Sequence, residues 1–417
     1  MQTALMPKVL VAAALVWPNA VRLCRAFRDA GFEVVAIAVP QHPVHRSRAP
    51  DRTFNYRPKA PLESLREAIA AQMPDIIIPC DDRIVGHLCA LRALGDDTST
   101  LIETSLGRGG ASGVIAKRAT LGEISLLPNV DVPRTDNVAT ASDLRDWVRK
   151  FGLPAMLKLD GSWGGNDIVA VRHESEIRRA FWEIRLRQNV LRGFKRYVTK
   201  GDVEALGRRR SAISVQSFVP GRSANATVAC WRGKVLAQIA VEVVESASPF
   251  GMATVVHVID GDAMVAAARS ICSHYMLSGL HGFDFIIDEQ NGVPKLIEIN
   301  PRATQIGHLN LGPGRDLAAA LFDALSGRSA AWRPPIQSGD ISLFPGEWWR
   351  DSQSSYLTST FHDVPYDDAD LARYYGFDLF QWPRRSSAGS ALAPRCWVTP
   401  GGLSNMISGA GSFACGL

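Results

Sequence analysis

The sequence lacks three features that would assign it to common functional classes. No stretch approaches the roughly 20 apolar residues of a membrane span. The seven cysteines form no C-x-x-C pair and no metal-finger spacing, which suits reduced thiols in the cytosol. A net charge of +5 is small for 417 residues, and its basic residues are mostly dispersed. We therefore expect a cytoplasmic protein that binds neither membranes nor nucleic acid.

Composition and length indicate a globular protein of several domains. The chain is 46% hydrophobic and 21% charged, as is usual for such proteins. Its 417 residues exceed one ordinary core, so two or three domains are expected. The apolar start, residues 1–16, resembles a signal peptide, but its run is short and lacks a convincing cleavage site. A first buried strand explains it better.

The first hundred residues alternate strand and helix patterns. Apolar runs occupy residues 8–15, 33–39 and 75–79, and helical spacing occupies residues 19–30 and 61–72. Such alternation predicts a parallel sheet covered on both faces, with ligands at the carboxyl ends of its strands. The Asp81–Asp82 loop then faces a ligand. The first turn, Val16 to Asn19, has no G-x-G-x-x-G motif, which argues against dinucleotide binding there.

The part after the Gly-rich linker 107–113 contains more hairpins, so an α+β arrangement with antiparallel sheets is predicted. We expect helices at 114–127 and 142–151, and strands at 155–159, 168–172, 213–218, 226–231, 234–244, 282–288 and 294–299. Signals weaken after about Trp332. From Ser386 onward the chain is rich in Ser, Gly and Ala, a composition typical of poor order.

The strongest chemical signal is a hairpin with polar residues on both strands. Two apolar strands flank an Asn-Gly turn, with Asp284 on the first strand and Glu298 and Asn300 on the second. Adjacent strands can bring these oxygens to one spot, and hard oxygen ligands suit Mg²⁺. Arg302 follows and can hold a phosphoryl group with its planar fork. The alternative is a hairpin with exposed polar positions, although carboxylates among apolar neighbours would be costly unless paired or metal-bound.

A second signal is the Gly-rich stretch that follows a predicted strand ending near Lys158. Backbone N–H groups of such loops can cradle an anion, and a nearby lysine can neutralise a phosphate. The stretch comprises Gly161, Ser162, Trp163, Gly164 and Gly165. It is not a Walker motif, because no lysine follows the glycines. An ordinary flexible loop is equally compatible, with Trp163 acting as a lid or simply packing.

A third, weaker signal is a strand that ends in Pro-Gly. Its last residues are Gln216, Ser217, Phe218 and Val219, and they can offer backbone groups and apolar walls to a planar ring. Strands that end in this way are common, so the pattern gains meaning only from its position.

In succession, these motifs resemble the ATP-grasp superfamily of ATP-dependent carboxylate–amine ligases. Lys117, Lys158 with its glycine loop, the strand V-Q-S-F-V-P-G, and D-F-x-x-D followed by L-I-E-I-N-P-R occur in the order of that superfamily, over residues 8–325. The resemblance implies that Lys117, Lys158 and residues 161–165 contact the nucleotide phosphates, and that residues 216–219 border adenine. It implies that Asp284, Glu298 and Asn300 hold Mg²⁺, or Mn²⁺ in its place, and that Arg302 meets the transferred phosphoryl group.

The resemblance also implies a domain plan. It consists of a Rossmann-like α/β domain over 1–108, an ATP-grasp domain over 109–330 and a C-terminal extension over 331–417. Within the ATP-grasp domain, a nucleotide lobe over about 130–220 precedes a metal-binding lobe over about 221–330. The expected ligands are ATP, a metal ion, and a small-molecule carboxylate and amine, and the sequence is compatible with a homodimer.

The implied reaction converts a carboxylate into an acyl phosphate, which an amine then attacks, with ADP as product. Two alternatives remain open, namely an enzyme that activates bicarbonate or carbamate, and a nucleotide-binding regulatory protein without turnover. The glutamate that many members carry near adenine is absent here; Gln216, Ser217 and Ser223 stand there, and Glu242 or Glu245 can substitute. Segments 81–83, 246–254 and 304–310 are expected to set specificity. The cysteines and His281 are expected to be structural, and for His308 a structural role is expected with substrate contact as the alternative.

Overall fold

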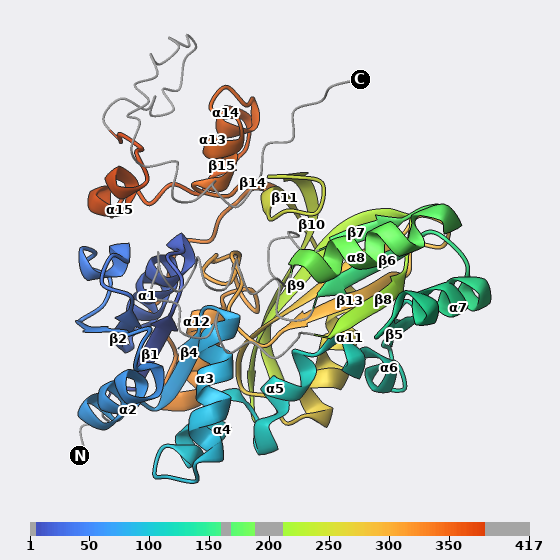
Figure 1. Cartoon of the computed structure of the whole chain (residues 1–417). Coiled ribbons are helices and arrows are strands. Elements are labelled where there is room, and N and C mark those ends of the chain that lie inside the picture. The colour runs from blue at the N-terminus through green and yellow to red at the C-terminus, as the bar shows by residue number, and fades with distance from the viewer. Residues whose placement is uncertain (1–5, 160–167, 188–211, 380–417) are drawn as a thin grey trace.

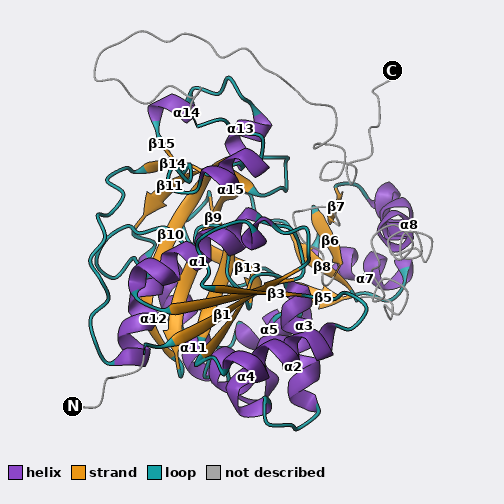
Figure 2. Cartoon of the chain, turned by 90° about the vertical axis from the view of Figure 1, so that its left-hand side faces the viewer, coloured by secondary structure: helices purple, strands orange, loops and turns teal. Residues whose placement is uncertain are grey.

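The described part of the chain folds around three β-sheets (Figures 1 and 2). The structure is a computed structural model that describes residues 6–159, 168–187 and 212–379. The first sheet has four strands in the order β3-β2-β1-β4, the second has seven in the order β13-β12-β9-β10-β11-β14-β15, and the third has four in the order β5-β8-β6-β7. Within the described ranges, no helix is both long and apolar enough to cross a bilayer.

The first sheet is entirely parallel, as the sequence predicts. Its strands are β1 (Lys8–Ala13), β2 (Glu33–Ala38), β3 (Arg52–Asn55) and β4 (Ile76–Pro79), and its helices include α1 (Pro18–Ala30), α2 (Pro61–Gln72), α3 (Asp82–Ala93) and α4 (Ser99–Leu106). Val9 and Val11 enter one core while Leu10 and Ala12 enter another, so both faces are buried. This two-sided burial explains the continuous apolar run of β1.

The second sheet contains the long antiparallel strands at the centre of Figure 1. They are β9 (Gly221–Trp231), β10 (Lys234–Ser246), β11 (Ala253–Ile259), β12 (Gly279–Asp288) and β13 (Pro294–Asn300), joined by β14 (Asp340–Ser342) and β15 (Phe361–His362). Helix α11 (Asp262–His274) packs on one face, and α12 (Leu317–Ser326) packs with α1 on the other. The α12 side therefore shares a core with the parallel sheet.

The third sheet forms a separate small layer under two helices (Figure 1). Its strands are β5 (Thr135–Asn137), β6 (Ala155–Leu159), β7 (Ile168–Val171) and β8 (Ile213–Ser217), and the helices are α7 (Ala141–Phe151) and α8 (Ile177–Arg187). A capping box begins α7, because Thr140 accepts from the backbone of Asp143 and Asp143 accepts in return. The hairpin-rich character predicted for this half is confirmed.

The structure corrects one predicted helix. Residues 114–127 were expected to form a single helix, but the chain forms α5 (Ala111–Ile115), a short 3₁₀ turn, and α6 (Leu121–Ile124). The break falls at Lys117, whose φ of −89° and ψ of 126° are extended. Ile115 and Leu121 both remain buried, so packing on the sheet is kept, and Arg118 turns inward between them.

The segment after Trp332 is built of short elements. They are β14, α13 (Gly346–Arg350), α14 (Tyr356–Ser359), β15 and α15 (Ala369–Tyr374), and they lie at the top of Figure 1. None exceeds six residues, which explains the weak periodicity of the sequence here. The tail expected to be poorly ordered, from Ser386, lies outside the described residues.

Candidate functional site

The predicted metal-binding residues do converge on the hairpin of β12 and β13. Asp284 lies directly opposite Glu298 in the antiparallel register, and the turn between the strands contains Gly292 at a φ of 71°. The Nδ2 atom of Asn300 donates to Asp284 Oδ2 over 3.0 Å. From the neighbouring strand β9, Asn225 Nδ2 donates to Asp284 Oδ1 over 2.6 Å. Asn225 is a member of this cluster that the sequence did not reveal.

The electrostatics of this cluster fit a divalent cation. Burial and the neighbouring charge of Glu298 raise the pKa of Asp284 to about 6, against the opposing hydrogen bonds from Asn300 and Asn225. Two carboxylates held face to face carry a repulsion that a cation relieves. Within the described residues no group of three or more His, Cys, Asp or Glu side chains gathers as a metal cage. A metal at Asp284 and Glu298 would therefore complete its shell with water or phosphate oxygens, as Mg²⁺ does.

Arg302 connects this hairpin to the first sheet. Its Nε donates to Asp82 Oδ1 over 3.0 Å, and its Nη2 donates to Asn300 Oδ1 over 3.0 Å. The backbone N–H of Ala303 donates to Pro79 O, at the carboxyl end of β4. Gly282 permits this approach, because a Cβ there would lie 2.2 Å from Thr304 Cγ2. The guanidinium thus stands where the carboxyl ends of the parallel strands, the edge predicted to face a ligand, meet the β12–β13 hairpin.

Lys158 reaches the same region from the small sheet. The residue is buried at the end of β6, and its Nζ donates to Gln216 Oε1 over 2.7 Å. Gln216 in turn donates to Thr135 Oγ1 over 2.9 Å, which fixes its amide. Burial and the charge of Arg118 lower the pKa of Lys158 to about 8, while Glu298 and Asp284 oppose the shift. The negative charges of Glu298 and Asp284 therefore act on the ammonium group of Lys158.

Arg118 bridges strand β6 of the small sheet and the β12–β13 hairpin, and its role could not be read from the sequence. Its Nη2 donates to Glu298 Oε1 over 2.7 Å, and its Nη1 donates to Leu159 O over 2.6 Å. Its neighbour Lys117, which the resemblance favoured, is exposed. The only available signal was a second basic residue beside Lys117 in a segment expected to be helical. The nucleotide contact of Lys117 stays a prediction.

The remaining predicted nucleotide-binding residues lie at the end of β8 or outside the described chain. Ser217 and Val219 are half-buried, and Phe218 exposes 44% of its surface. The backbone is held in place at Ser217, because Ser217 N donates to Arg134 O. The predicted phosphate loop, Gly161 to Gly165, lies outside the described residues. The two glutamates proposed as substitutes for the ribose contact are both in ion pairs, Glu242 with Arg222 and Glu245 with Arg350.

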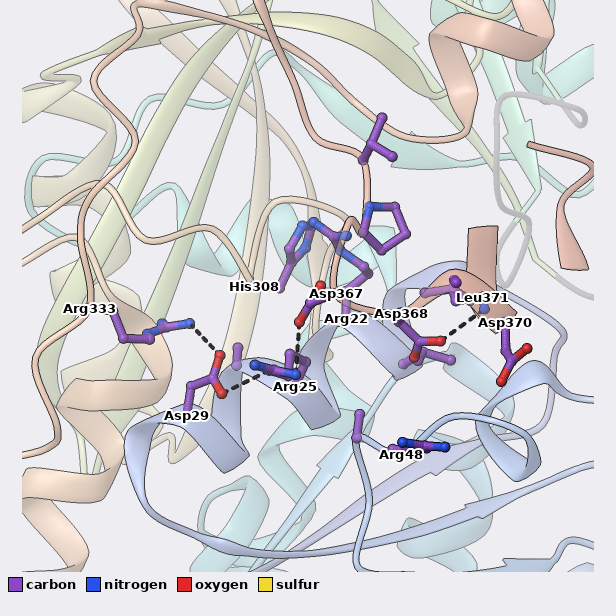
Figure 3. Close-up of a pocket in the computed structure, with 16 residues that line it drawn as sticks. Arg22, Arg25, Asp29, Arg48, His308, Arg333, Asp367, Asp368, Asp370 and Leu371 are labelled. Carbon is purple, nitrogen blue, oxygen red and sulfur yellow. Dashed lines mark hydrogen bonds and ion pairs between the residues drawn. The ribbon is translucent and has the colours of Figure 1, made fainter. Parts of the chain in front are cut away.

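His281 and His308 both have protein partners. His281 is buried and its Nε2 lies 2.8 Å from Ser278 O, and burial lowers its pKa to about 4. His308 Nε2 lies 2.8 Å from Asp363 Oδ2, and the carboxylate of Asp363 also pairs with Arg22. His308 lines a cavity of about 460 Å³ between α1 and the C-terminal segment (Figure 3). Of the predicted nucleotide and metal residues that the structure describes, none lines that cavity.

Replacing Arg118 tests whether its hydrogen bonds to Leu159 O and Glu298 stabilise the packing of the small sheet on the β12–β13 hairpin. We expect Arg118→Met to lower the melting temperature by several degrees, because Glu298 and Leu159 O lose a charged donor, at a cost of about 1–3 kcal/mol. The side chain of Arg118 is only 5% exposed, although that of Glu298 is 30% exposed. Differential scanning fluorimetry provides the measurement. Arg222→Met, which breaks an exposed pair with Glu242, is the control and should change stability by less than about 1 kcal/mol. Equal melting temperatures for the two variants would contradict the role of Arg118.

The pKa of Lys158 predicts a pH dependence of nucleotide binding. A phosphate favours the charged ammonium, so binding is strongest below the pKa of about 8 and weakens as pH rises through it. Above pH 8 the Kd for Mg-ADP should rise by up to about tenfold per pH unit. Nucleotide titrations at pH 7, 8 and 9 measure this. Lys158→Arg, which stays charged throughout, should bind with a flat profile; an equally steep profile in that variant would mean that another group titrates.

Comparison with solved structures identifies the fold. The biotin carboxylase domain of Hydrogenobacter thermophilus 2-oxoglutarate carboxylase, in complex with MgADP and bicarbonate, aligns with a TM-score of 0.55 at 14% identity, over 79% of this chain and 72% of that one. The N5-carboxyaminoimidazole synthase of Aspergillus clavatus, with ADP and 5-aminoimidazole ribonucleotide, aligns with a TM-score of 0.57 at 15% identity, over 80% of each chain. The L-amino acid ligase of Bacillus licheniformis aligns with a TM-score of 0.50 at 15% identity, over 76% and 75%.

These neighbours are ATP-grasp enzymes, and the chain has the ATP-grasp fold, as its motifs predict. At the level of sequence, no protein-family model and no curated protein matches it. Identities of 14–15% establish the fold alone, so the function has to be argued from the site.

Proposed function

We propose that the chain is an ATP-dependent ligase that activates a carboxylate as an acyl phosphate and joins it to an amine. The observation that carries this proposal is the convergence of three cations, Lys158, Arg118 and Arg302, around Asp284 and Glu298. Phosphoryl transfer requires alignment and neutralisation of charge more than a nucleophilic side chain. Fold neighbours crystallised with ADP or MgADP support the use of a nucleotide and Mg²⁺.

Each residue of the cluster has a defined task in this proposal. Asp284 and Glu298, with Asn300, hold Mg²⁺, which when bound shields the charge of the nucleotide phosphates. The oxygen of Asn300 accepts from Arg302, and its second lone pair would be the one that ligates a metal. Lys158 neutralises a phosphate from the opposite lobe, and Arg302 meets the oxygens of the transferred phosphoryl group.

The proposed domain plan assigns these tasks to separate parts of the chain. The region over 1–108 provides the ligand-facing edge with Asp82, the nucleotide lobe over 130–220 provides Lys158, and the metal lobe over 221–330 provides the hairpin. The region over 331–417 extends the large sheet through β14 and β15. The site thus lies where three parts of the chain meet, which suits a reaction between separate substrates.

Activation of bicarbonate is the second candidate function, because one fold neighbour was crystallised with bicarbonate and MgADP. An assay of ADP release from ATP in the presence of Mg²⁺ distinguishes the ligase from the bicarbonate-activating enzyme. One set of reactions contains pooled carboxylic acids and the other contains bicarbonate, and each set is run with and without pooled amines. The ligase proposal predicts ADP release that requires both a carboxylic acid and an amine. Release with bicarbonate alone would favour the second candidate, and tight ATP binding without ADP release in any pool would indicate a regulatory protein.

A further inference from the structure

The carboxylate of Asp82 stands beside the guanidinium of Arg302 at the edge of the proposed active site. Asp82 is the first residue of α3, and only Cys80 and Asp81 separate it from the carboxyl end of β4. Its Oδ1 accepts from Arg302 Nε over 3.0 Å, and its side chain remains 36% exposed. Within the described part of the chain, Oδ2 of Asp82 accepts no hydrogen bond. A negatively charged acceptor is therefore available next to the predicted phosphoryl-binding residue.

The preceding residue, Asp81, is a structural carboxylate by contrast. One of its oxygens accepts from the backbone of Arg83 and Ile84 and so caps α3. Its other oxygen accepts from the backbone of Ala14 and Leu15, which fixes the loop after β1. Asp81 is thus fully engaged in holding the backbone, and Asp82 is the member of the pair that can face a ligand.

Arg302 also has donors that no described residue uses. A guanidinium has five N–H groups, and three of them are used in this structure, by Asp82, by Asn300 and, over 3.4 Å, by the backbone oxygen of Ala303. The remaining two lie on Nη1 and Nη2 and suit a carboxylate. Arg302 itself is buried, which strengthens its attraction for an anion.

We propose that the acid activated by this enzyme is an α-amino acid, held by its carboxylate at Arg302 and by its ammonium at Oδ2 of Asp82. This inference rests on the proposed ligase function. An α-amino acid carries its two opposite charges on neighbouring atoms, and the Arg302–Asp82 pair presents the complementary charges side by side. An acid without an amine would leave the carboxylate of Asp82 facing only water and Arg302, and so would gain less from the site.

Binding the amine at Asp82 also determines the direction of ligation. A carboxylate oxygen of the bound amino acid attacks the γ-phosphorus of ATP, and the bond from that phosphorus to ADP breaks. A separate amine then attacks the acyl carbon, the bond to phosphate breaks, and the amine proton passes to solvent. Because Asp82 favours the charged ammonium, the amine of the activated amino acid has no lone pair for attack. The acceptor amine must come from a second molecule.

The test combines two acid pools with two proteins. One pool contains α-amino acids, and the other contains the same acids with hydrogen in place of the amine. A mixture of amino-acid amides, which have an amine but no free carboxylate, is the acceptor in both. We expect the wild-type chain to release ADP at least about tenfold faster with the amino acids, and Asp82→Asn to lower kcat/KM for them by about 10- to 150-fold. For the deaminated acids, kcat/KM should change less than about threefold, since only the ammonium contact is lost.

Two controls and three contrary outcomes make the test decisive. Asp97→Asn, an exposed carboxylate of the same domain, should behave as wild type, and melting curves check that both variants fold. Equal losses for both pools in Asp82→Asn would mean that Asp82 only positions Arg302 and would overturn the inference. A wild-type chain that uses both pools equally would overturn it without any variant. No ADP release with any acid would instead refute the ligase function on which it rests.

Discussion

Glu298→Gln should reduce Mg²⁺-dependent ADP formation by at least about 100-fold while leaving the fold intact. Glu298 lies opposite Asp284 in the hairpin register and pairs with Arg118, so its charge faces both the predicted metal and the nucleotide lobe. Glutamine preserves the length of the side chain and an oxygen that can accept from Arg118. The change therefore removes the negative charge at the metal with little loss of packing.

The measurement for Glu298→Gln is a coupled ADP assay over a range of Mg²⁺ concentrations, with melting curves recorded in parallel. Glu289→Gln is a matched control, because Glu289 is exposed in the turn of the same hairpin and should behave as wild type. Turnover of Glu298→Gln within a few-fold of wild type, at any Mg²⁺ concentration, would mean that the metal site lies elsewhere.

Lys158→Met is expected to weaken nucleotide binding by about 10- to 150-fold, the equivalent of one charge-assisted hydrogen bond of about 1.5–3 kcal/mol. Methionine fills a similar volume, so the buried end of β6 stays packed, but Gln216 loses its donor. ADP formation should fall as well, because the lysine also neutralises charge during phosphoryl transfer.

The two variants should differ in a way that a general loss of structure cannot imitate. Lys158→Met should weaken the binding of ADP with and without Mg²⁺, whereas Glu298→Gln should mainly abolish the gain in affinity that Mg²⁺ provides. Titration calorimetry with ADP, with and without Mg²⁺, separates these effects. Lys234→Met, on an exposed position at the start of β10, serves as the control for removing a positive charge. Unchanged ADP affinity in Lys158→Met would exclude Lys158 from the phosphate site.

The pairing of the β12–β13 hairpin could be predicted because its information is local. Alternating apolar residues and an Asn-Gly turn specify two paired strands, and the pairing brings Asp284 to face Glu298. Asn225 could not be predicted in the same way, since its contact with Asp284 depends on which strand lies beside β12. That neighbour, β9, is set by the packing of the whole sheet and not by any local pattern.

Arg118 was missed for a different physical reason. The apolar spacing on either side of it is compatible with one continuous helix, yet the chain becomes extended at Lys117 and turns Arg118 into the core. Its hydrogen bonds to Leu159 O and Glu298 offset the cost of burying the charge, and both partners are distant in sequence. The pairing of Asp82 with Arg302 is equally non-local, although the sequence predicts that Asp82 lies near a ligand-facing loop.

The most direct test of the proposed site is a crystal structure of the chain with ADP and Mg²⁺. We predict that the ADP phosphates contact Lys158 Nζ and that the metal ion is bound by Asp284 and Glu298, with Arg302 facing the position of the γ-phosphate. Nucleotide density in the cavity beside α1, where Arg22 and His308 lie, or density with no contact to the β12–β13 hairpin, would contradict this assignment.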